Sequence, residues 1–199
     1  MKDLKSFYKD KIILIAGGVG SIGSEIVRKV LGCEARAIRI LDNSETGLFD
    51  LEQEIQSEKI RVLVGDIRDI ERLERAIEGV NIVFHVAALK HVPLCESNPF
   101  EAVKTNVIGT QNLIDVSIHE QVEKFITIST DKAVNQVNVM GATNLLAETL
   151  LVTEEISKQV LTLPMYPTLT REEMDYMVEK IKSFCEVLER WTEKSIRVC

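Results

Sequence analysis

Three glycines directly after a short apolar run constrain this chain more than any other feature of its sequence. Gly17, Gly20 and Gly23 form the pattern G-x-x-G-x-x-G between the run 11–16 and the amphipathic segment 21–31. A turn from a buried strand into a helix needs residues without a Cβ where two backbones approach closely. The helix N-terminus then presents unpaired N–H groups and the positive end of its dipole, which attract phosphate. The pattern predicts a phosphate-binding turn, and the alternative is a tight strand–helix turn without a ligand.

Apolar runs alternate with amphipathic segments along most of the chain. The runs predicted as strands are residues 11–16, 36–41, 60–64, 81–85 and 124–128. The segments predicted as helices are residues 21–31, 45–55, 69–77, 99–118 and 140–152. Strands that alternate with helices are typical of a parallel sheet with helices on both faces and right-handed crossovers. The predicted fold class is therefore α/β, a doubly wound parallel sheet of the Rossmann type.

The sequence changes character after the last of these helices. Residues 160–163 form a short apolar run that we predict as a sixth strand, and Pro164 should end it because proline cannot donate to a strand ladder. Residues 170–191 begin with a capping box and continue as an amphipathic helix. We predict a dinucleotide-binding domain over 1–152 and a tail over 153–199 with no separate substrate domain. The tail either completes the sheet in the order 3-2-1-4-5-6 or exchanges with a neighbouring subunit.

Composition excludes several classes of function. Lys and Arg number 24 against 31 Asp and Glu, and no basic cluster stands out, which argues against nucleic-acid binding. The four cysteines and three histidines lack the spacing of metal ligands, and Lys90-His91 is a weak candidate at best, so no metal is predicted. The N-terminus has no apolar signal core, and no apolar run reaches about 18 residues. We therefore expect a cytoplasmic protein that does not enter a membrane.

Asp42 ends the second predicted strand, about twenty residues after the glycines. An acidic residue at this place accepts hydrogen bonds from the ribose hydroxyls of a dinucleotide, which favours NAD over NADP. No arginine follows Asp42 directly to bind a 2′-phosphate, although NADP stays open. The alternatives for Asp42 are a helix N-cap and a solvated loop residue.

Five segments carry a resemblance to a known family. They are residues 17–25, 41–45, 65–69, 83–115 and 128–148, which read GGVGSIGSE, LDNSE, GDIRD, VFHVAALKHVPLCESNPFEAVKTNVIGTQNLID and ISTDKAVNQVNVMGATNLLAE. Over residues 9–151 the chain resembles the inverting UDP-N-acetylglucosamine 4,6-dehydratases and related capsular-polysaccharide enzymes. These are members of the extended short-chain dehydrogenase/reductase superfamily. The resemblance implies an NAD or NADP cofactor, a UDP-linked sugar as substrate and a role in polysaccharide or amino-sugar biosynthesis.

The resemblance also implies the residues of the site. The cofactor-binding positions are Gly17, Gly20, Ser21, Ile22, Gly23, Asp42, Asp66, Ile67, Ala87, Ala88, Lys90, Asn106, Ser129 and Asn144. The catalytic positions are Thr130, Asp131, Lys132 and Met140. Asp131 and Lys132 would be the acid–base pair that eliminates water. Without the flanking match, this pair would indicate only a solvated turn.

Two departures from the family pattern affect the expected activity. The superfamily has Tyr-x-x-x-Lys on the helix after the fifth strand, where this chain has Met140 and Asn144. A thioether cannot transfer a proton and an amide carries no charge. Some members of the dehydratase family also have Met at the first position, so the loss of the lysine weighs more than Met140 alone. The similarity ends near Leu151, and residues 156–184 resemble instead the C-terminal end of DegT/StrS sugar aminotransferases, without their cofactor lysine motif. The resemblance therefore implies a truncated and impaired active site.

Two functions follow from these observations. The first is a nucleotide-sugar 4,6-dehydratase, a lyase, whose activity is impaired in this form. The second is a dinucleotide-binding remnant or fusion product without turnover. Relatives in the superfamily dimerise through the helices that correspond to residues 99–118 and 140–152, so we expect a homo-oligomer. The sequence leaves the identity of the sugar open.

Overall fold

The computed structural model describes residues 6–130, 138–153 and 160–165. The chain divides into two compact units, Met1–Pro164 and Met165–Cys199. All but the last of the described residues belong to the first unit.

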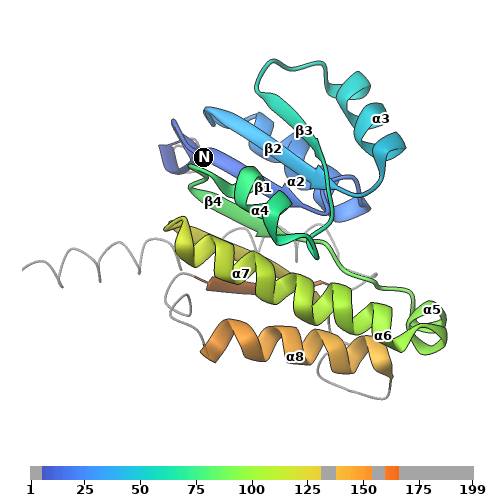
Figure 1. Ribbon diagram of the computed structural model, residues 1–199. Coiled ribbons are helices and arrows are strands. Elements are labelled where there is room, and N and C mark those ends of the chain that lie inside the picture. Colours follow the sequence, from blue (N-terminus) through green and yellow to red (C-terminus); the bar gives the residue numbers. More distant parts are fainter. Residues whose placement is uncertain (1–5, 131–137, 154–159, 166–199) are drawn as a thin grey trace, which may run out of the picture. The chain divides into compact units, whose positions relative to one another are not determined.

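A six-stranded sheet forms the centre of this unit (Figure 1). Its strands are β1 (Ile12–Ala16), β2 (Ala37–Asp42), β3 (Ile60–Val64), β4 (Ile82–His85), β5 (Lys124–Thr130) and β6 (Val160–Met165). Their order is β3-β2-β1-β4-β5-β6, as the sequence predicts, and the pairs among the first five strands are parallel. The direction of the connections reverses between β1 and β4. In open α/β sheets, ligands bind outside the carboxyl ends of the strands at such a switch point.

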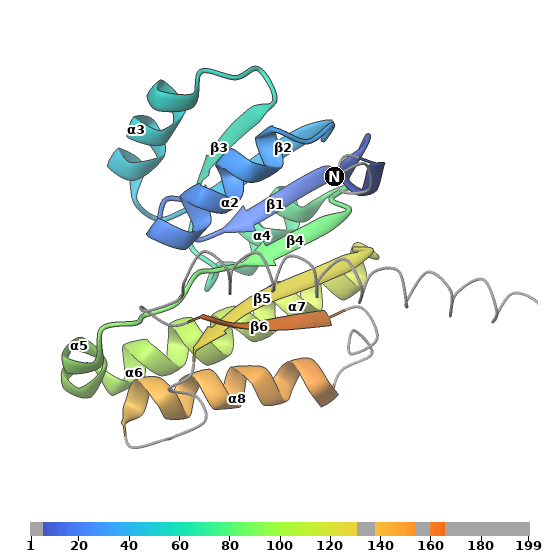
Figure 2. The same cartoon turned by 180° about the vertical axis from the view of Figure 1, so that it is seen from behind.

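Helices pack against both faces of the sheet. They are α2 (Ser21–Leu31), α3 (Glu45–Ile55), α4 (Ile70–Ile77), α5 (Val92–Ser97), α6 (Pro99–Ala102), the π-helical turn η1 (Val103–Ile108), α7 (Gly109–His119) and α8 (Val139–Thr153). One core contains residues of α2 and α3, and the other contains residues of α4 and α7. α8 contacts η1 and α7, and it runs alongside them in Figures 1 and 2.

Strand β1 shows why the strands of this sheet are continuous apolar runs in the sequence. Successive side chains of a strand point to opposite faces. Leu14 and Ala16 accordingly belong to the core beneath α4 and α7, and Ile13 and Ile15 to the core beneath α2 and α3. All four are fully buried. Burial of each large aliphatic side chain contributes about 1.5–3 kcal/mol before entropy losses. A strand covered on both faces therefore has no polar alternation.

The segment 99–118 differs from its prediction. The sequence indicates one long helix, but the structure has α6, η1 and α7 in succession, and a separate short helix, α5, that was not predicted. Within η1 the N–H of Gly109 donates to the carbonyl of Lys104, five residues back, so the turn is wider than an α-helical one. Such π-turns occur frequently at functional sites. Here the wide turn contains Asn106, a buried polar residue.

The prediction that the sixth strand stops before Pro164 is wrong, because β6 continues to Met165. β6 is the last strand in the sheet order. On such an edge strand, a proline is tolerated where its missing N–H faces away from the neighbouring strand. The predicted helix over 170–191 lies outside the described residues.

Candidate functional site

The glycine turn brings three backbone segments together. Gly17 has a φ of 83°, which favours glycine, and its N–H donates to the carbonyl of Leu41 at 2.8 Å. A Cβ on Gly17 would stand 2.5 Å from the backbone nitrogen of Ala87, and one on Gly23 would overlap the carbonyl oxygen of Gly17. A Cβ on Gly20 would have only an ordinary contact, 3.6 Å from that same oxygen. Gly17 and Gly23 are thus required by the fold itself, whereas Gly20 is not.

A cavity of about 520 Å³ lies beside this turn, at the carboxyl ends of β1, β2 and β4. Ligand pockets commonly have volumes of about 300–1,000 Å³. The predicted cofactor-binding residues that line the cavity are Gly17, Gly20, Ser21, Ile22, Asp42, Asp66, Ile67, Ala87, Ala88 and Lys90. Gly20 is the N-cap of α2, and the first turn of that helix contains no acidic residue. The N-terminal N–H groups of α2 and its dipole therefore favour an anion at this end of the cavity.

Asp42 is held at the cavity by backbone amides. One carboxylate oxygen accepts from the N–H of Val19 at 3.2 Å, and the other accepts from the N–H of Ser44 at 3.0 Å. The alternative of Asp42 as the N-cap of α3 is wrong, because Ser44 is the N-cap and its hydroxyl accepts from the N–H of Gly47. These two hydrogen bonds fix the orientation of the Asp42 carboxylate. It lines the cavity next to the glycine turn.

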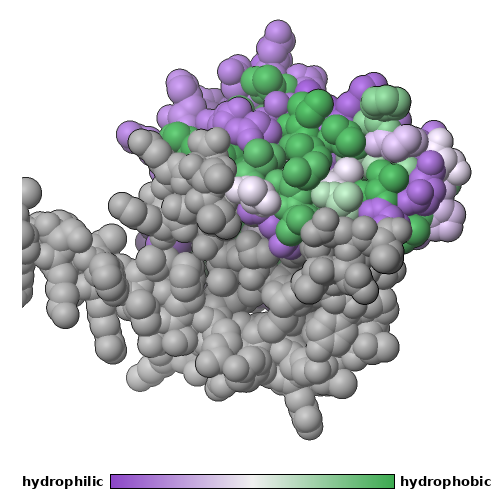
Figure 3. Space-filling model, turned by 90° about the horizontal axis from the view of Figure 1, so that it is seen from below, coloured by the Kyte–Doolittle hydropathy of each residue, from purple (hydrophilic) through white to green (hydrophobic). Residues whose placement is uncertain are grey.

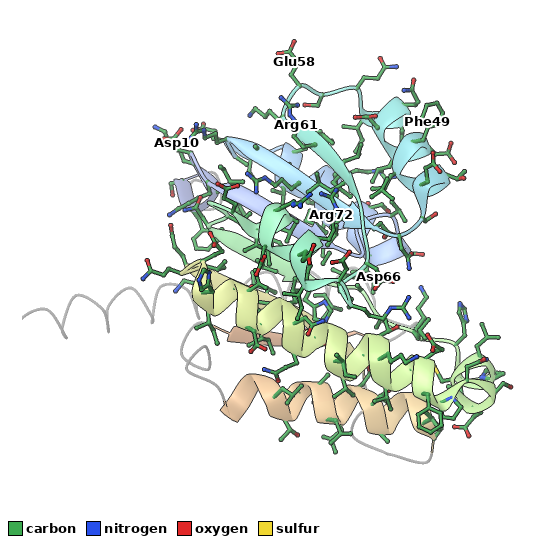
Figure 4. The ribbon with its side chains drawn as sticks, in the orientation of Figure 1. Asp10, Phe49, Glu58, Arg61, Asp66 and Arg72 are labelled. Carbon is green, nitrogen blue, oxygen red and sulfur yellow. The ribbon has the colours of Figure 1, made fainter. Side chains whose placement is uncertain are left out.

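A group of charged side chains lines another part of the cavity. The guanidinium of Arg68 donates to Asp66 at 2.6 Å and to Glu101 at 2.8 Å. Burial opposes ionisation of Asp66, but the hydrogen bonds from Arg68 prevail and lower the pKa of that carboxyl. Figure 4 shows Asp66 just after the end of β3. Arg68 and Glu101 were not predicted. Arg68 lies within the quoted segment 65–69 and Glu101 within the quoted segment 83–115, but nothing in the sequence indicated that the two side chains pair.

Asn106 supports the wall of the cavity from beneath. Its side chain is 2% exposed. The amide oxygen accepts from the N–H of Leu89 at 2.8 Å, and the amide nitrogen donates to the carbonyl of Leu89 at 3.1 Å and to the hydroxyl of Thr143 at 3.0 Å. Asn106 therefore connects the segment after β4 with α8. It does not line the large cavity, so any contribution to binding is indirect.

The structure describes only some of the predicted catalytic residues. Asp131 and Lys132 lie outside the described residues, and Ser129 and Thr130 are placed by backbone alone at the end of β5. Met140 is 3% exposed near the beginning of α8, and the amide nitrogen of Asn144 donates to its sulfur at 3.0 Å. Asn144 lines a second, smaller cavity rather than the large one. Within the described part of the chain, no cluster of side chains fits a metal ion.

Comparison with known proteins identifies the chain at the level of the family. A family described as polysaccharide biosynthesis protein matches residues 13–165. The chain belongs to this family. The match covers the sheet, the cavity and the strand β6.

Three relatives illustrate the polysaccharide biosynthesis family. An uncharacterized membrane protein of Methanocaldococcus jannaschii is 66% identical over 79% of this chain and 47% of its own length. The inverting UDP-N-acetylglucosamine 4,6-dehydratase of Campylobacter jejuni is 42% identical over 73% of this chain and 44% of its own. The crystal structure of UDP-glucose 4-epimerase from Thermotoga maritima, with UDP-glucose, has a TM-score of 0.63 and 27% identity over 70% of this chain and 50% of its own.

The chain spans about half the length of the relatives it matches. The names of the Campylobacter dehydratase and the Thermotoga epimerase agree with the resemblance to nucleotide-sugar enzymes of the extended short-chain dehydrogenase/reductase type seen in the sequence. Among the described residues, no helix is long and apolar enough to cross a membrane.

Proposed function

We propose that this member of the polysaccharide biosynthesis family binds a nicotinamide dinucleotide in the 520 Å³ cavity and forms the cofactor half of a nucleotide-sugar 4,6-dehydratase of the UDP-N-acetylglucosamine type. The glycine turn carries this proposal. Gly17 and Gly23 leave no room for side chains inside the turn, whereas Gly20 leaves the N-terminus of α2 accessible from the cavity. A pyrophosphate fits this cradle because it needs close approach to backbone N–H groups.

The carboxylate of Asp42 favours NAD over NADP. It would accept hydrogen bonds from both hydroxyls of the adenosine ribose, whereas a 2′-phosphate there would place negative charge beside negative charge. Arg68 and Lys90 are the cationic residues among the described lining residues, and the guanidinium of Arg68 is already bound to Asp66 and Glu101. We expect Asp66 and Ile67 to flank the adenine and Ala87, Ala88 and Lys90 to lie toward the nicotinamide.

The bound cofactor would supply hydride acceptance and hydride return. The chain's own residues would then move protons. Asp131 and Lys132 follow β5 at the carboxyl end of the sheet, where ligands of this fold bind. One of them would remove the proton from C5 of the sugar, and the other would protonate the hydroxyl that leaves from C6. Water is thus eliminated across C5 and C6.

The alternative function is dinucleotide binding without turnover, and the pair Met140 and Asn144, above all the missing lysine at position 144, favours it. Met140 takes the place of the tyrosine of the superfamily, is buried and accepts a hydrogen bond from Asn144. Neither side chain can take a proton from a sugar hydroxyl at neutral pH. The 4-epimerase activity of a relative also needs proton removal from such a hydroxyl, so this observation counts against both activities.

Two measurements on the full chain separate these functions. Calorimetric titration with NAD and with NADP tests the cavity, and mass analysis of products from UDP-N-acetylglucosamine and UDP-glucose tests turnover. We expect micromolar binding of NAD, weaker binding of NADP, and little or no 4-keto product. A kcat on the order of 1 per second or more would contradict the impaired form. No binding of either dinucleotide would contradict the whole proposal.

We also propose that the chain forms a homo-oligomer through the surface of α6, η1 and α8. Phe100 is 79% exposed, and Ile108 and Leu146 are about half exposed. Figure 3 views the molecule from the side of α8 and shows hydrophobic residues gathered there. Clustered exposed apolar side chains mark interaction sites. Sedimentation should give a dimer that Phe100→Asp converts to a monomer, whereas Phe49→Asp, on α3, should leave the dimer intact.

A further inference from the structure

A chain of buried hydrogen bonds begins at the end of β4. The ring nitrogen Nε2 of His85 lies 2.8 Å from the hydroxyl oxygen of Thr110, and this hydroxyl donates to the carbonyl of Asn106 at 2.6 Å. All three residues are at least 95% buried. Because the Thr110 proton is used on Asn106, Nε2 must be the donor to Thr110. The hydrogen bonds thus assign the tautomer of His85, with its proton on Nε2.

This tautomer leaves Nδ1 of His85 as an acceptor. Among the residues that the structure describes, it is the one buried side-chain nitrogen or oxygen without a hydrogen-bond partner. Burial lowers the pKa of His85 to about 4, so the ring is neutral at physiological pH. A buried acceptor without a partner costs about 1–3 kcal/mol. Such an atom indicates a ligand that completes the site.

A small cavity adjoins the ring. Its volume is about 20 Å³, and His85, Thr127, Asn144 and Glu148 provide polar groups around it. One water needs roughly 10–15 Å³ of such volume and two to four polar partners. Ala87 and Ala88 line both this cavity and the large one, so the two cavities share a wall.

We propose that this small cavity binds one ordered water, which donates to Nδ1 of His85 and bonds to the polar side chains of α8, Asn144 or Glu148. The water joins β4 to α8 directly behind the wall formed by Ala87 and Ala88. His85 is then a positioning residue, because it holds Asn106 through Thr110 and α8 through the water. The inference does not depend on which cofactor the large cavity binds.

The chemistry of the lining favours water over an ion. His85 is neutral, and burial raises the pKa of Glu148, which weakens the preference of that carboxyl for a charged partner. A water can donate to the imidazole and to an amide or carboxyl oxygen at the same time. A cation cannot donate a hydrogen bond to Nδ1, and an anion would face the lone pair of that nitrogen.

A crystal structure of the full chain at high resolution tests the site directly. We expect a water within about 3.2 Å of Nδ1 of His85. A cavity without density would overturn the proposal, as would a metal ion recognised by its anomalous signal.

Melting temperatures of three variants supply a second test. His85→Gln keeps a donor for Thr110 but removes the acceptor at the place of Nδ1. His85→Asn keeps an acceptor near that place but loses the hydrogen bond to Thr110. His85→Phe removes both groups. If the water binds, all three should melt at lower temperature, by roughly 2–4 °C for each hydrogen bond lost. If Nδ1 has no partner, His85→Gln should melt at the same or a higher temperature, because it removes the unsatisfied acceptor and keeps a donor for Thr110. That result would overturn the proposal.

Discussion

The glycine turn beside the large cavity and the region of α8 behind it differ in how strictly the sequence determines them. At the glycine turn, backbone atoms approach so closely that Gly17 and Gly23 admit no side chain, and Asp42 is fixed by two amides. Near α8, behind the wall formed by Ala87 and Ala88, the packing depends on buried polar side chains such as Asn106, and Met140 and Asn144 stand where the resemblance implies a tyrosine and a lysine. In the proposed function, cofactor binding would depend on backbone sterics, whereas turnover would depend on a few side chains. The first can persist where the second is lost.

The largest effect should come from the glycine turn. Gly20→Val should fold normally, because a side chain there meets no close neighbour within the protein. It should nevertheless weaken dinucleotide binding on the order of 100-fold or more, about 3 kcal/mol, because it fills the space at the N-terminus of α2. Calorimetric titration and melting temperature together measure both effects.

Gly23→Ala is the matched control. Its Cβ would overlap the carbonyl oxygen of Gly17, so the fold itself should lose several kcal/mol of stability. Unchanged dinucleotide affinity in Gly20→Val would show that the anion does not lie at this turn. An unchanged melting temperature in Gly23→Ala would contradict the close packing of the turn.

A second effect concerns the acid stability of the region beside the small cavity, where His85 is buried. The pKa of His85 is about 4 in the folded chain and about 6.5 when unfolded. Between these values the unfolded chain binds a proton that the folded chain does not. The free energy of unfolding should therefore fall as the pH drops from 6.5 to 4, by up to ~3 kcal/mol from this residue. Urea unfolding across this range measures the slope.

His85→Gln isolates this contribution because glutamine does not titrate. Glu148 acts in the opposite sense, since its raised pKa makes the folded chain take up a proton before the unfolded chain does as the pH falls. The carboxyls of Asp66 and Glu101 have lowered pKa values, so the stability that they contribute is lost only when the pH falls near and below the ordinary pKa values of these groups. These groups are present in the original chain and in the His85→Gln variant, so their contributions cancel when the two pH slopes are compared. A slope that is identical in both proteins would contradict a buried neutral His85.

A third and smaller effect tests Asp42. Asp42→Asn removes a charged acceptor, and hydrogen bonds to charged groups contribute about 1.5–3 kcal/mol. We expect NAD affinity to fall about tenfold to a hundredfold and NADP affinity to fall less, so that the preference narrows. Asp50→Asn, on the exposed surface of α3, is the control and should change neither affinity. Equal losses for both dinucleotides would indicate that Asp42 only stabilises the turn.

The same difference between the two regions explains what the sequence could predict. The extents of α2, α3 and β3 agree with the predictions to the residue, because apolar periodicity and a glycine or an N-cap define their ends. The break of residues 99–118 into α6, η1 and α7 could not be seen, since the i→i+5 turn at Asn106 leaves the apolar spacing helical. The extension of β6 through Pro164 depends on its edge position, which is a tertiary property.

Among the site residues, those near the glycine turn were found by motif, and the structure places them around one cavity. Arg68 and Glu101 form their ion pair across 33 residues of sequence, and His85 acquires its partner, Thr110, from α7. Such long-range polar contacts have no local signature. Their existence follows only from the packing of α6, η1 and α7 beside the sheet.

The smallest effect we expect concerns Asn144, at the position of the superfamily's lysine. A lysine at position 144 would place an ammonium group beside the small cavity, one helical turn before Glu148. It would offer donors to Nδ1 of His85 and supply a positive charge that the amide of Asn144 does not carry. Asn144→Lys should raise any residual turnover by about tenfold, or ~1.4 kcal/mol of barrier. The gain stays modest because Met140 still cannot transfer a proton.

Two controls make this prediction specific. Asn144→Met has similar length without charge, and it should leave turnover unchanged. Asn144→Lys combined with Met140→Tyr should exceed the single change, because the tyrosine supplies the proton transfer that a lysine then facilitates by lowering the pKa of the phenol. Product formation from UDP-N-acetylglucosamine at saturating NAD measures all three variants. The double variant could stay inactive while its dinucleotide affinity is intact. The defect would then lie in binding of the sugar substrate rather than in the side chains of α8, and the contrast between the glycine turn and α8 would not explain the loss of turnover.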